Sequence, residues 1–230
     1  MPTSQACAEC PVRDSAVCAA LDQAELAELA RIGQHRSFRR GDTIFAAGDG
    51  SVACATLIAG AAKLSKIDAD GVERIVALVH PAGFLGQLFA STTQHDVVAL
   101  TDSRLCMFPR TAFEKLMKDH PALTRSILDR TLAELDSSRA LAELIGRRDV
   151  KSRVAGLLLS FARAAAPSPC ALAAEFDMPL SREETASLLG TTIETISRRL
   201  TELEQSGLIE RQGARGIIIR DAPSLSDLAR

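Results

Sequence analysis

Three cysteines near the start of the chain have the type and spacing to bind a metal. Cys7, Cys10 and Cys18 lie in the run CAECPVRDSAVC, with two and seven residues between them. Thiolates at such short spacing are ligands for a metal ion or an iron-sulfur cluster. The sequence therefore predicts a metal or redox site in an amino-terminal arm, residues 1–20.

The composition indicates a folded chain in a reducing compartment. The 230 residues are 47% hydrophobic and 24% charged, with a net charge of -2. No run of about 18 apolar residues suggests a membrane span, and the first residues lack the basic and apolar regions of a signal peptide. We therefore expect a cytoplasmic location, no membrane partner, and cysteines that serve metal or redox chemistry rather than disulfides.

A β-roll is predicted after the arm, over residues 21–120. Glycine-containing turn sequences recur throughout residues 37–109. The runs between them are short and β-branched, which is typical of strands in a small roll or barrel. The strands expected on this basis are Thr43–Phe45, Cys54–Ala59, Ile75–Val79 and Val97–Leu100.

A long helix is predicted over residues 121–146, with Pro121 in its first turn and Gly146 at its end. Its apolar residues approach a heptad seam that could pair with a second copy, or could instead pack on the chain's own roll. Ser138 or Arg139 interrupts the seam, which would make a dimer marginal and easy to switch. The dimerisation residues expected are Leu128, Leu132, Leu135, Ala142 and Ile145.

The remainder, residues 147–230, has the pattern of a winged helix-turn-helix. A helix over about 150–165 comes first, and then Ser181 with Glu184 forms a capping box for a helix that ends at Gly190. Thr191 and Glu194 repeat the box and would open the second helix. The run LIERQGARGIIIR has apolar segments around a glycine turn, as a β-hairpin wing requires.

The second helix of this pair is the predicted reading helix. Glu194, Ser197 and Arg198 share one face near its start, and their donors and acceptors suit a G·C pair and its neighbours. Alternatively, Glu194 and Arg198 form only a surface ion pair. The residues that could contact phosphates, or could simply be solvated, are Thr192, Arg199, Arg211 and Arg215.

These motifs together resemble the CRP/FNR superfamily of bacterial transcription regulators over nearly the whole chain. The resemblance implies an α+β fold with a cyclic-nucleotide-binding-like β-roll, a dimerisation helix and a winged helix-turn-helix. It also implies a homodimer that binds double-stranded DNA and RNA polymerase, and is not an enzyme. The Glu194, Ser197 and Arg198 triplet resembles the FNR branch, which implies a TTGAT-type inverted repeat.

The resemblance also bears on the ligand. Gly86-Gln87 and the following STTQHDVV lack the arginine with which the cyclic-nucleotide branch pairs a phosphate, so cyclic AMP is not expected. FNR-type oxygen sensors hold a 4Fe-4S cluster, which implies Cys7, Cys10 and Cys18 as ligands here. Cys106 matches the family's fourth ligand, with Cys54 and Cys170 as the other candidates. Oxygen would destroy the cluster and weaken the dimer, and protein prepared in air would lack it.

Other readings of the cysteines remain open. They include zinc, a nitric-oxide-responsive cluster, a thiol switch, and heme with His35, His80, His95 or His120 as axial ligand. A different class would be an iron-sulfur electron carrier, which would bind no operator. The sequence contains no nucleophile-base set, paired carboxylates or phosphate-binding glycine loop that would indicate an enzyme.

Overall fold

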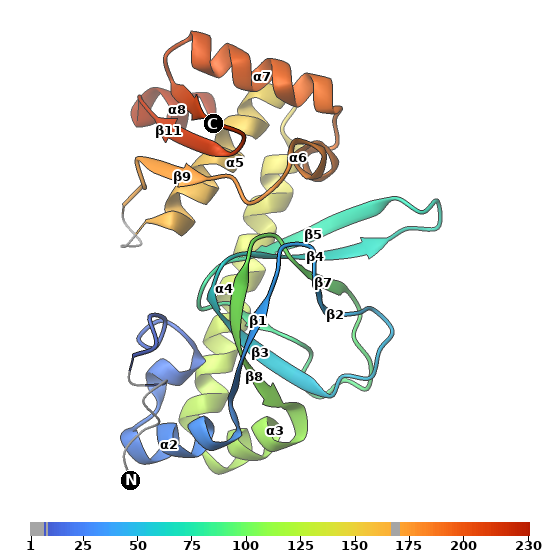
Figure 1. Cartoon of the computed structure of the whole chain (residues 1–230), viewed down its shortest axis with the longest axis vertical. Coiled ribbons are helices and arrows are strands. Elements are labelled where there is room, and N and C mark those ends of the chain that lie inside the picture. The colour runs from blue at the N-terminus through green and yellow to red at the C-terminus, as the bar shows by residue number, and fades with distance from the viewer. Residues whose placement is uncertain (1–6, 8, 167–170) are drawn as a thin grey trace. The chain divides into compact units, whose positions relative to one another are not determined.

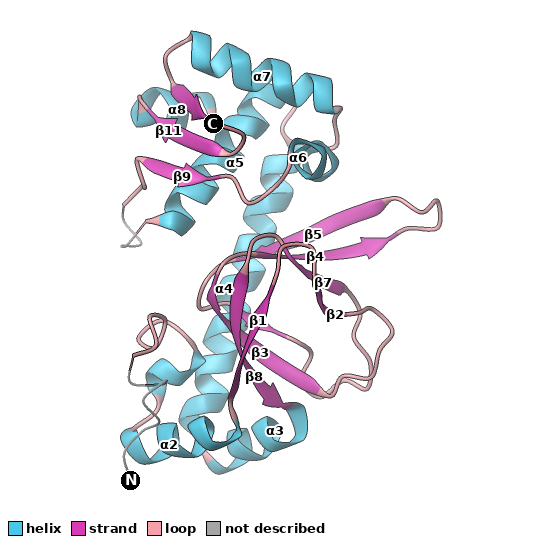
Figure 2. Cartoon of the chain, viewed as in Figure 1, coloured by secondary structure: helices cyan, strands magenta, loops and turns pink. Residues whose placement is uncertain are grey.

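The computed structural model describes residue 7, residues 9–166 and residues 171–230, so Cys170 lies outside the described residues. One compact unit comprises Met1–Val72 and Val76–Ser137, and the other comprises Glu73–Ile75 and Ser138–Arg230. Figure 1 labels the elements, and Figure 2 shows that each unit combines helices with sheet. The predicted α+β class is confirmed.

The first unit contains a roll of two four-stranded sheets, ordered β1-β8-β3-β6 and β2-β7-β4-β5. Neighbouring strands pair antiparallel where their register is defined. The strands are β1 (Gln34–Phe38), β2 (Thr43–Phe45), β3 (Ala53–Ala59), β4 (Ala62–Ile67), β5 (Glu73–Val79), β6 (Phe84–Leu85), β7 (Asp96–Ala99) and β8 (Ser103–Pro109). The four predicted strands are confirmed to within two residues at each end.

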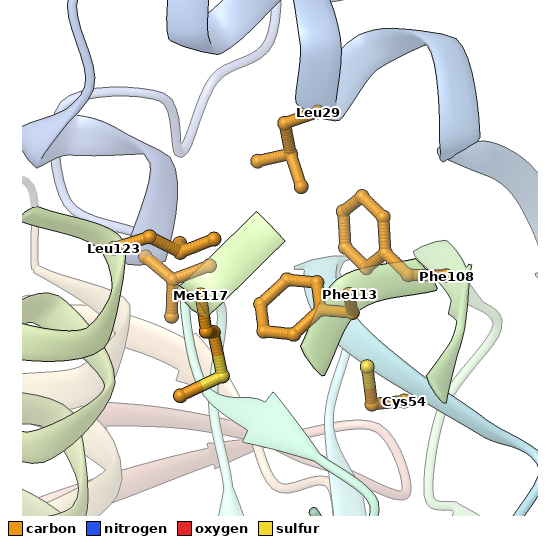
Figure 3. Close-up of a cluster of buried hydrophobic side chains, with 7 residues drawn as sticks. Leu29, Cys54, Phe108, Phe113, Met117 and Leu123 are labelled. Atoms are coloured by element: carbon orange, nitrogen blue, oxygen red, sulfur yellow. The ribbon is translucent and has the colours of Figure 1, made fainter. Parts of the chain in front are cut away.

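Aromatic packing closes one end of the roll. Phe113 of helix α3 (Arg110–Asp119) is fully buried, with its ring centroid 5.5 Å from that of Phe84 and 5.2 Å from that of Phe108. Figure 3 shows Phe108, Cys54 and Met117 around the ring of Phe113. Cys54 is 0% exposed and belongs to this cluster, so its thiol is surrounded by core side chains.

The amino-terminal arm is anchored by apolar side chains of its own. Val12, Ala16 and Val17 are buried against the roll, and a short 3₁₀ helix, η1 (Val17–Ala20), follows. Helix α2 (Gln23–Ile32) then begins at a capping box between Asp22 and Glu25, an element that our sequence analysis missed. The arm is therefore joined to the roll by packing as well as by any metal.

His120 connects α2 to the end of α3. Its Nδ1 lies 3.3 Å from Oε1 of Glu25, and its Nε2 lies 3.0 Å from Oε2 of Glu28. The hydrogen bond with Glu28 is the main reason that the pKa of His120 is raised above its ordinary value of 6.5. Protonated His120 thus holds together the helix that follows the arm and the helix that precedes α4 (Pro121–Gly146).

Because its pKa is higher in the folded chain than in the unfolded chain, His120 should stabilise the fold in a pH-dependent way. The stabilisation is complete below the unfolded pKa and is lost as the pH rises through the raised folded pKa. We expect the melting temperature of wild type to exceed that of His120→Gln at acidic pH, with the difference shrinking toward alkaline pH. Thermal unfolding over a pH series, with His95→Gln as control, checks this; a pH-independent difference would contradict it.

The second unit has the predicted winged helix-turn-helix. Helix α5 (Val150–Ala165) supplies buried Leu157 and Leu158, helices α6 (Arg182–Leu189) and α7 (Ile193–Gln205) form the pair, and α8 (Ala222–Leu228) ends the chain. A three-stranded sheet orders β10 (Ile209–Gln212), β11 (Gly216–Ile219) and β9 (Glu175–Asp177). Strands β10 and β11 are the wing hairpin, which is confirmed.

One predicted cap is wrong. Thr192, not Thr191, is the N-cap of α7, and its side chain accepts a hydrogen bond from the backbone N–H of Thr195. Gly190 adopts a left-handed conformation with φ of 60°, which ends α6 and leaves Thr191 in the turn. Among the described residues, no helix is long and apolar enough to cross a membrane.

Candidate metal centre and nucleic-acid interface

The four cysteines expected to bind metal all line one cavity of the first unit. Cys7, Cys10 and Cys18 come from the arm and Cys106 comes from β8. The remaining wall is mostly apolar and includes Ile58 of β3, Leu26 and Leu29 of α2, and Phe108. The arm therefore brings its thiols to the same small space as the thiol of the roll.

Cys106 occupies the middle of a row across the first sheet. His35 of β1 is its register partner on one side, and Thr56 of β3 is its partner on the other. Both flanking residues also line the cavity. A Cβ atom added at Gly33 would lie 3.1 Å from Sγ of Cys106 and 3.0 Å from the ring of Phe108, so a larger residue at position 33 would press on the thiol.

The arm thiols are positioned by turns of the arm itself. The thiol of Cys18 donates a hydrogen bond to the carbonyl of Arg13 at 3.7 Å, and the N–H of Arg13 donates to the carbonyl of Cys10 at 3.1 Å. Cys10, Cys18 and Cys106 all pack against a buried cluster that contains Val12 and Ile58. Apolar packing on both sides thus brings the two parts of the site together.

Burial and repulsion from neighbouring cysteines disfavour the thiolate forms of Cys18 and Cys106. Burial, followed by the charges of Cys7, Cys10 and Cys18, raises the pKa of Cys106 to about 12. Burial, followed by the charge of Cys10, raises the pKa of Cys18 to about 11. The four groups are therefore close enough to interact electrostatically, and a bound cation would offset the cost of ionising them.

The thiols share a cavity without forming a completed ligand set. Among the described residues, no three His, Cys, Asp or Glu side chains already form a group that could hold a metal ion. The cavity has a volume of about 30 Å³. Cys54 does not line it, and its thiol pKa is raised to about 12, chiefly by burial.

The histidines considered as heme ligands have different surroundings. His35 lines the cysteine cavity, and His120 lies between two glutamates. Burial lowers the pKa of His80, which favours its neutral form. His95 has a partly buried position in the loop before β7. These four residues therefore do not line a common site.

The arm also contacts helix α4. The guanidinium of Arg130 donates a hydrogen bond to the carbonyl of Ser15, in the arm between Cys10 and Cys18. Val17 of the arm and Ile127 of α4 pack in one hydrophobic cluster. Glu134 of α4 accepts a hydrogen bond from the N–H of Phe84 at 3.3 Å. Helix α4 therefore contacts both the arm and the roll.

The predicted dimer seam is largely open to solvent. Leu128, Leu132 and Leu135 are 58%, 52% and 44% exposed, and Ala142 is also exposed. Ile145 is half-buried. Three exposed leucines on one stripe of a helix are unusual unless another surface covers them. The alternative of a helix whose seam packs on its own roll does not fit the three leucines.

The predicted reading residues lie on the first turns of α7. Glu194 and Arg198 are exposed, and no ion pair joins them within the described part of the chain. Ser197 is half-buried, and its hydroxyl accepts a hydrogen bond from the guanidinium of Arg182 at 3.2 Å. Arg182 of α6, which our sequence analysis missed, thus lies beside the triplet and adds a second positive charge.

The predicted phosphate contacts are mostly engaged within their own domain. Arg199 pairs with Glu202 at 2.6 Å, and Arg211 donates from Nε to Glu204 at 2.9 Å. Arg215 donates to the carbonyl of Pro179 at 3.0 Å. Because each of these three arginines already donates to a carboxylate or a carbonyl, exposed Arg198 is the better candidate for a contact with DNA.

The roll loop that would bind a cyclic nucleotide begins with close packing. A Cβ atom at Gly86, whose φ is 101°, would lie 2.9 Å from the carbonyl oxygen of Ala53. Gln87 follows, and no arginine occurs from there to β7. Because this loop has no arginine that could pair with the phosphate of cyclic AMP, we do not expect the chain to bind cyclic AMP.

Comparison with known proteins gives the same domain order. The sequence model of the cyclic nucleotide-binding domain family matches residues 35–120, and the sequence model of the Crp-like helix-turn-helix domain family matches residues 152–228. The transcriptional activator protein FnrL of Cereibacter sphaeroides is 37% identical over 226 residues, which cover 97% of this chain and 91% of FnrL.

Two further proteins are similar over most of their length. The nitrogen fixation regulation protein FixK of Bradyrhizobium diazoefficiens is 33% identical over 232 residues, which cover 100% of this chain and 93% of FixK. The solved structure of FixK2 from Bradyrhizobium japonicum superposes with a TM-score of 0.77 at 26% identity, covering 86% of this chain and 98% of FixK2. FnrL and FixK are named as regulators, not as enzymes.

Proposed function

We propose that this chain, which belongs to the CRP/FNR family of DNA-binding transcription regulators, is an oxygen-responsive transcriptional activator. Its iron-sulfur cluster would be held by Cys7, Cys10, Cys18 and Cys106. Its active form would be a homodimer that binds an inverted repeat and recruits RNA polymerase. The observation that carries the proposal is that these four cysteines line one cavity.

The chemistry of the cavity fits an iron-sulfur cluster. Four thiols are the ligand set of a 4Fe-4S cluster, and an apolar wall limits water at such a centre. The pKa of Cys106 is raised by its burial beside three other thiols, so a bound cation would be needed to stabilise four thiolates in this cavity. When bound, the cluster would supply an oxygen-labile link between the arm and the roll.

The arm can pass a change at the cysteines to the dimer helix through its own contacts. Ser15 lies between Cys10 and Cys18, and its carbonyl accepts the hydrogen bond of Arg130 in α4. Val17, next to Cys18, packs with Ile127 of α4. If the arm shifts, these contacts change at Ile127 and Arg130, on either side of Leu128, where the exposed seam begins. The arm thereby biases the packing of α4 against a second copy.

Dimerisation and DNA binding are linked by geometry. A two-fold dimer carries two reading helices, which suits two half-sites about 34–36 Å apart on one face of the duplex. A monomer engages one half-site and loses the gain in affinity that a linked second contact gives. Weakening the seam therefore weakens operator binding without any change in α7.

The test compares one protein before and after exposure to air. Protein made without oxygen should contain about four iron and four acid-labile sulfide per chain, absorb broadly in the visible, and elute as a dimer that binds a TTGAT-type repeat. Air should bleach the absorption, shift the protein toward monomer and weaken binding. A colourless protein with the same oligomeric state and DNA affinity in both conditions would contradict the proposal.

Arg198 should carry a large part of the sequence specificity. We expect Arg198→Ala to cost about 1–3 kcal/mol per half-site, because it removes a bidentate donor to guanine, and to relax specificity at one base pair. Arg198→Lys keeps the charge and should recover affinity but not specificity. Binding titrations on operators changed at one position check this, with Arg220→Ala, which breaks the pair with Glu210, as control. Unchanged specificity in Arg198→Ala would contradict the assignment.

A further inference from the structure

Thr56 is the register neighbour of Cys106 on the face of the sheet that lines the cysteine cavity. The row runs His35, Cys106, Thr56 and Phe84 across strands β1, β8, β3 and β6. Residues directly opposite on antiparallel strands point to the same face, with Cβ atoms about 4.5–5.5 Å apart. Thr56 and Cys106 both line the cavity.

The hydroxyl of Thr56 is buried and has no hydrogen-bond partner within the described part of the chain. Its residue is 4% exposed, and its Oγ1 is inaccessible to solvent. Two other threonine hydroxyls are paired: Thr124 donates to the carbonyl of Met117 at 2.6 Å, and Thr185 donates to that of Ser181 at 2.7 Å. A buried hydroxyl without a partner destabilises the fold. We therefore expect the hydroxyl of Thr56, in the wall of the cysteine cavity, to find a hydrogen-bond acceptor in the functional state of the protein.

We propose that Thr56 is a positioning residue that donates its O–H to sulfur at the Cys106 side of the metal site. The inference rests on the proposed function, because the acceptor is a thiolate or a cluster sulfide. The neutral Cys106 thiol is a weak acceptor, whereas an ionised, metal-bound sulfur is a strong one. The hydroxyl is therefore poorly satisfied without metal and well satisfied with it.

A donor at this position has a defined effect on the cluster. Hydrogen bonds to cluster sulfurs withdraw electron density and raise the reduction potential. A higher potential makes oxidation of the cluster less favourable. Thr56 would thus set how fast the sensor responds to oxygen, while the four cysteines determine whether it responds at all.

The test uses Thr56→Val, which keeps the shape of the side chain and removes the donor, and Thr56→Ser, which keeps the donor. Thr43→Val makes the same chemical change on an exposed strand position of the other sheet and serves as control. All four proteins are loaded without oxygen, and iron, acid-labile sulfide and thermal unfolding are measured first. Wild type without iron and sulfide would contradict the proposed function itself, and this inference with it.

With loaded protein, the readouts are the reduction potential, the iron–thiolate stretching frequencies in resonance Raman spectra, and the rate of bleaching in air. We expect Thr56→Val to have a lower potential, shifted frequencies and about fivefold faster bleaching, as the loss of one ordinary hydrogen bond implies. Thr56→Ser and Thr43→Val should resemble wild type. The inference is overturned if loaded Thr56→Val matches wild type, or if Thr56→Ser changes as much as Thr56→Val, since the second result indicates packing.

Discussion

Cys106→Ala is expected to abolish the cluster and, with it, the air-sensitive dimer, while the chain still folds. Of the four cysteines that line the cavity, Cys106 is the one on the sheet, where His35 and Thr56 flank it in register. Mutation of a residue that hydrogen-bonds to a metal ligand typically weakens metal binding about 10- to 100-fold, and removal of the ligand itself should weaken it more. We expect little iron, no visible absorption, and operator binding as weak as that of wild type after air.

Cys54→Ala is the matched control. It lies two residues before Thr56 on the same strand, its thiol is buried, and it does not line the cavity. It should retain iron, sulfide and dimerisation, at a cost of about 1 kcal/mol in stability from the lost packing with Phe108 and Phe113. Iron analysis, absorption and size measurement decide the matter. If Cys54→Ala loses iron and Cys106→Ala retains it, the fourth ligand has been assigned to the wrong cysteine.

The sequence predicts much of this fold because local patterns agree with the packing. The long helix has its predicted bounds at Pro121 and Gly146, and the hairpin around Gly213 forms the wing. Strand β1 was missed because its residues are mostly exposed and polar, so it shows little hydrophobic alternation. Helix α2 was missed although Asp22 and Glu25 form a capping box before an amphipathic run. That pattern could have identified it.

The candidate site was predictable in its residue types but not in its surroundings. Cysteine spacing and the family resemblance single out four thiols, and packing of the arm brings them to one cavity. Sequence cannot show that Arg199 and Arg211 are already paired with glutamates, because Glu202 and Glu204 are ordinary helix-surface residues until their geometry is known. Nor can it distinguish Thr56 from other strand threonines, because the missing partner is a three-dimensional property.

Leu135→Asp is expected to prevent dimerisation even when the cluster is present. Fully burying a leucine contributes about 1.5–3 kcal/mol. A dimer would cover only the 44% of Leu135 that is exposed in the single chain, and a two-fold seam counts this twice, so the lost burial should weaken the dimer by about 1.3–2.6 kcal/mol. Two carboxylates facing each other near the axis add repulsion. The lost burial alone corresponds to about one to two orders of magnitude in the dimer dissociation constant.

The partial exposure of the seam makes this effect measurable. Because Leu135 is 44% exposed in the single chain, its replacement removes only part of a leucine's packing within that chain, and the monomer should keep its fold. Ser137→Asp is the control, since at about 100° per residue it lies roughly 200° around the helix from Leu135. Sedimentation without oxygen should find Leu135→Asp monomeric and brown, and Ser137→Asp dimeric and brown. A dimeric, iron-loaded Leu135→Asp would mean that another surface joins the two copies, and the arm would then have to act through that surface rather than through α4.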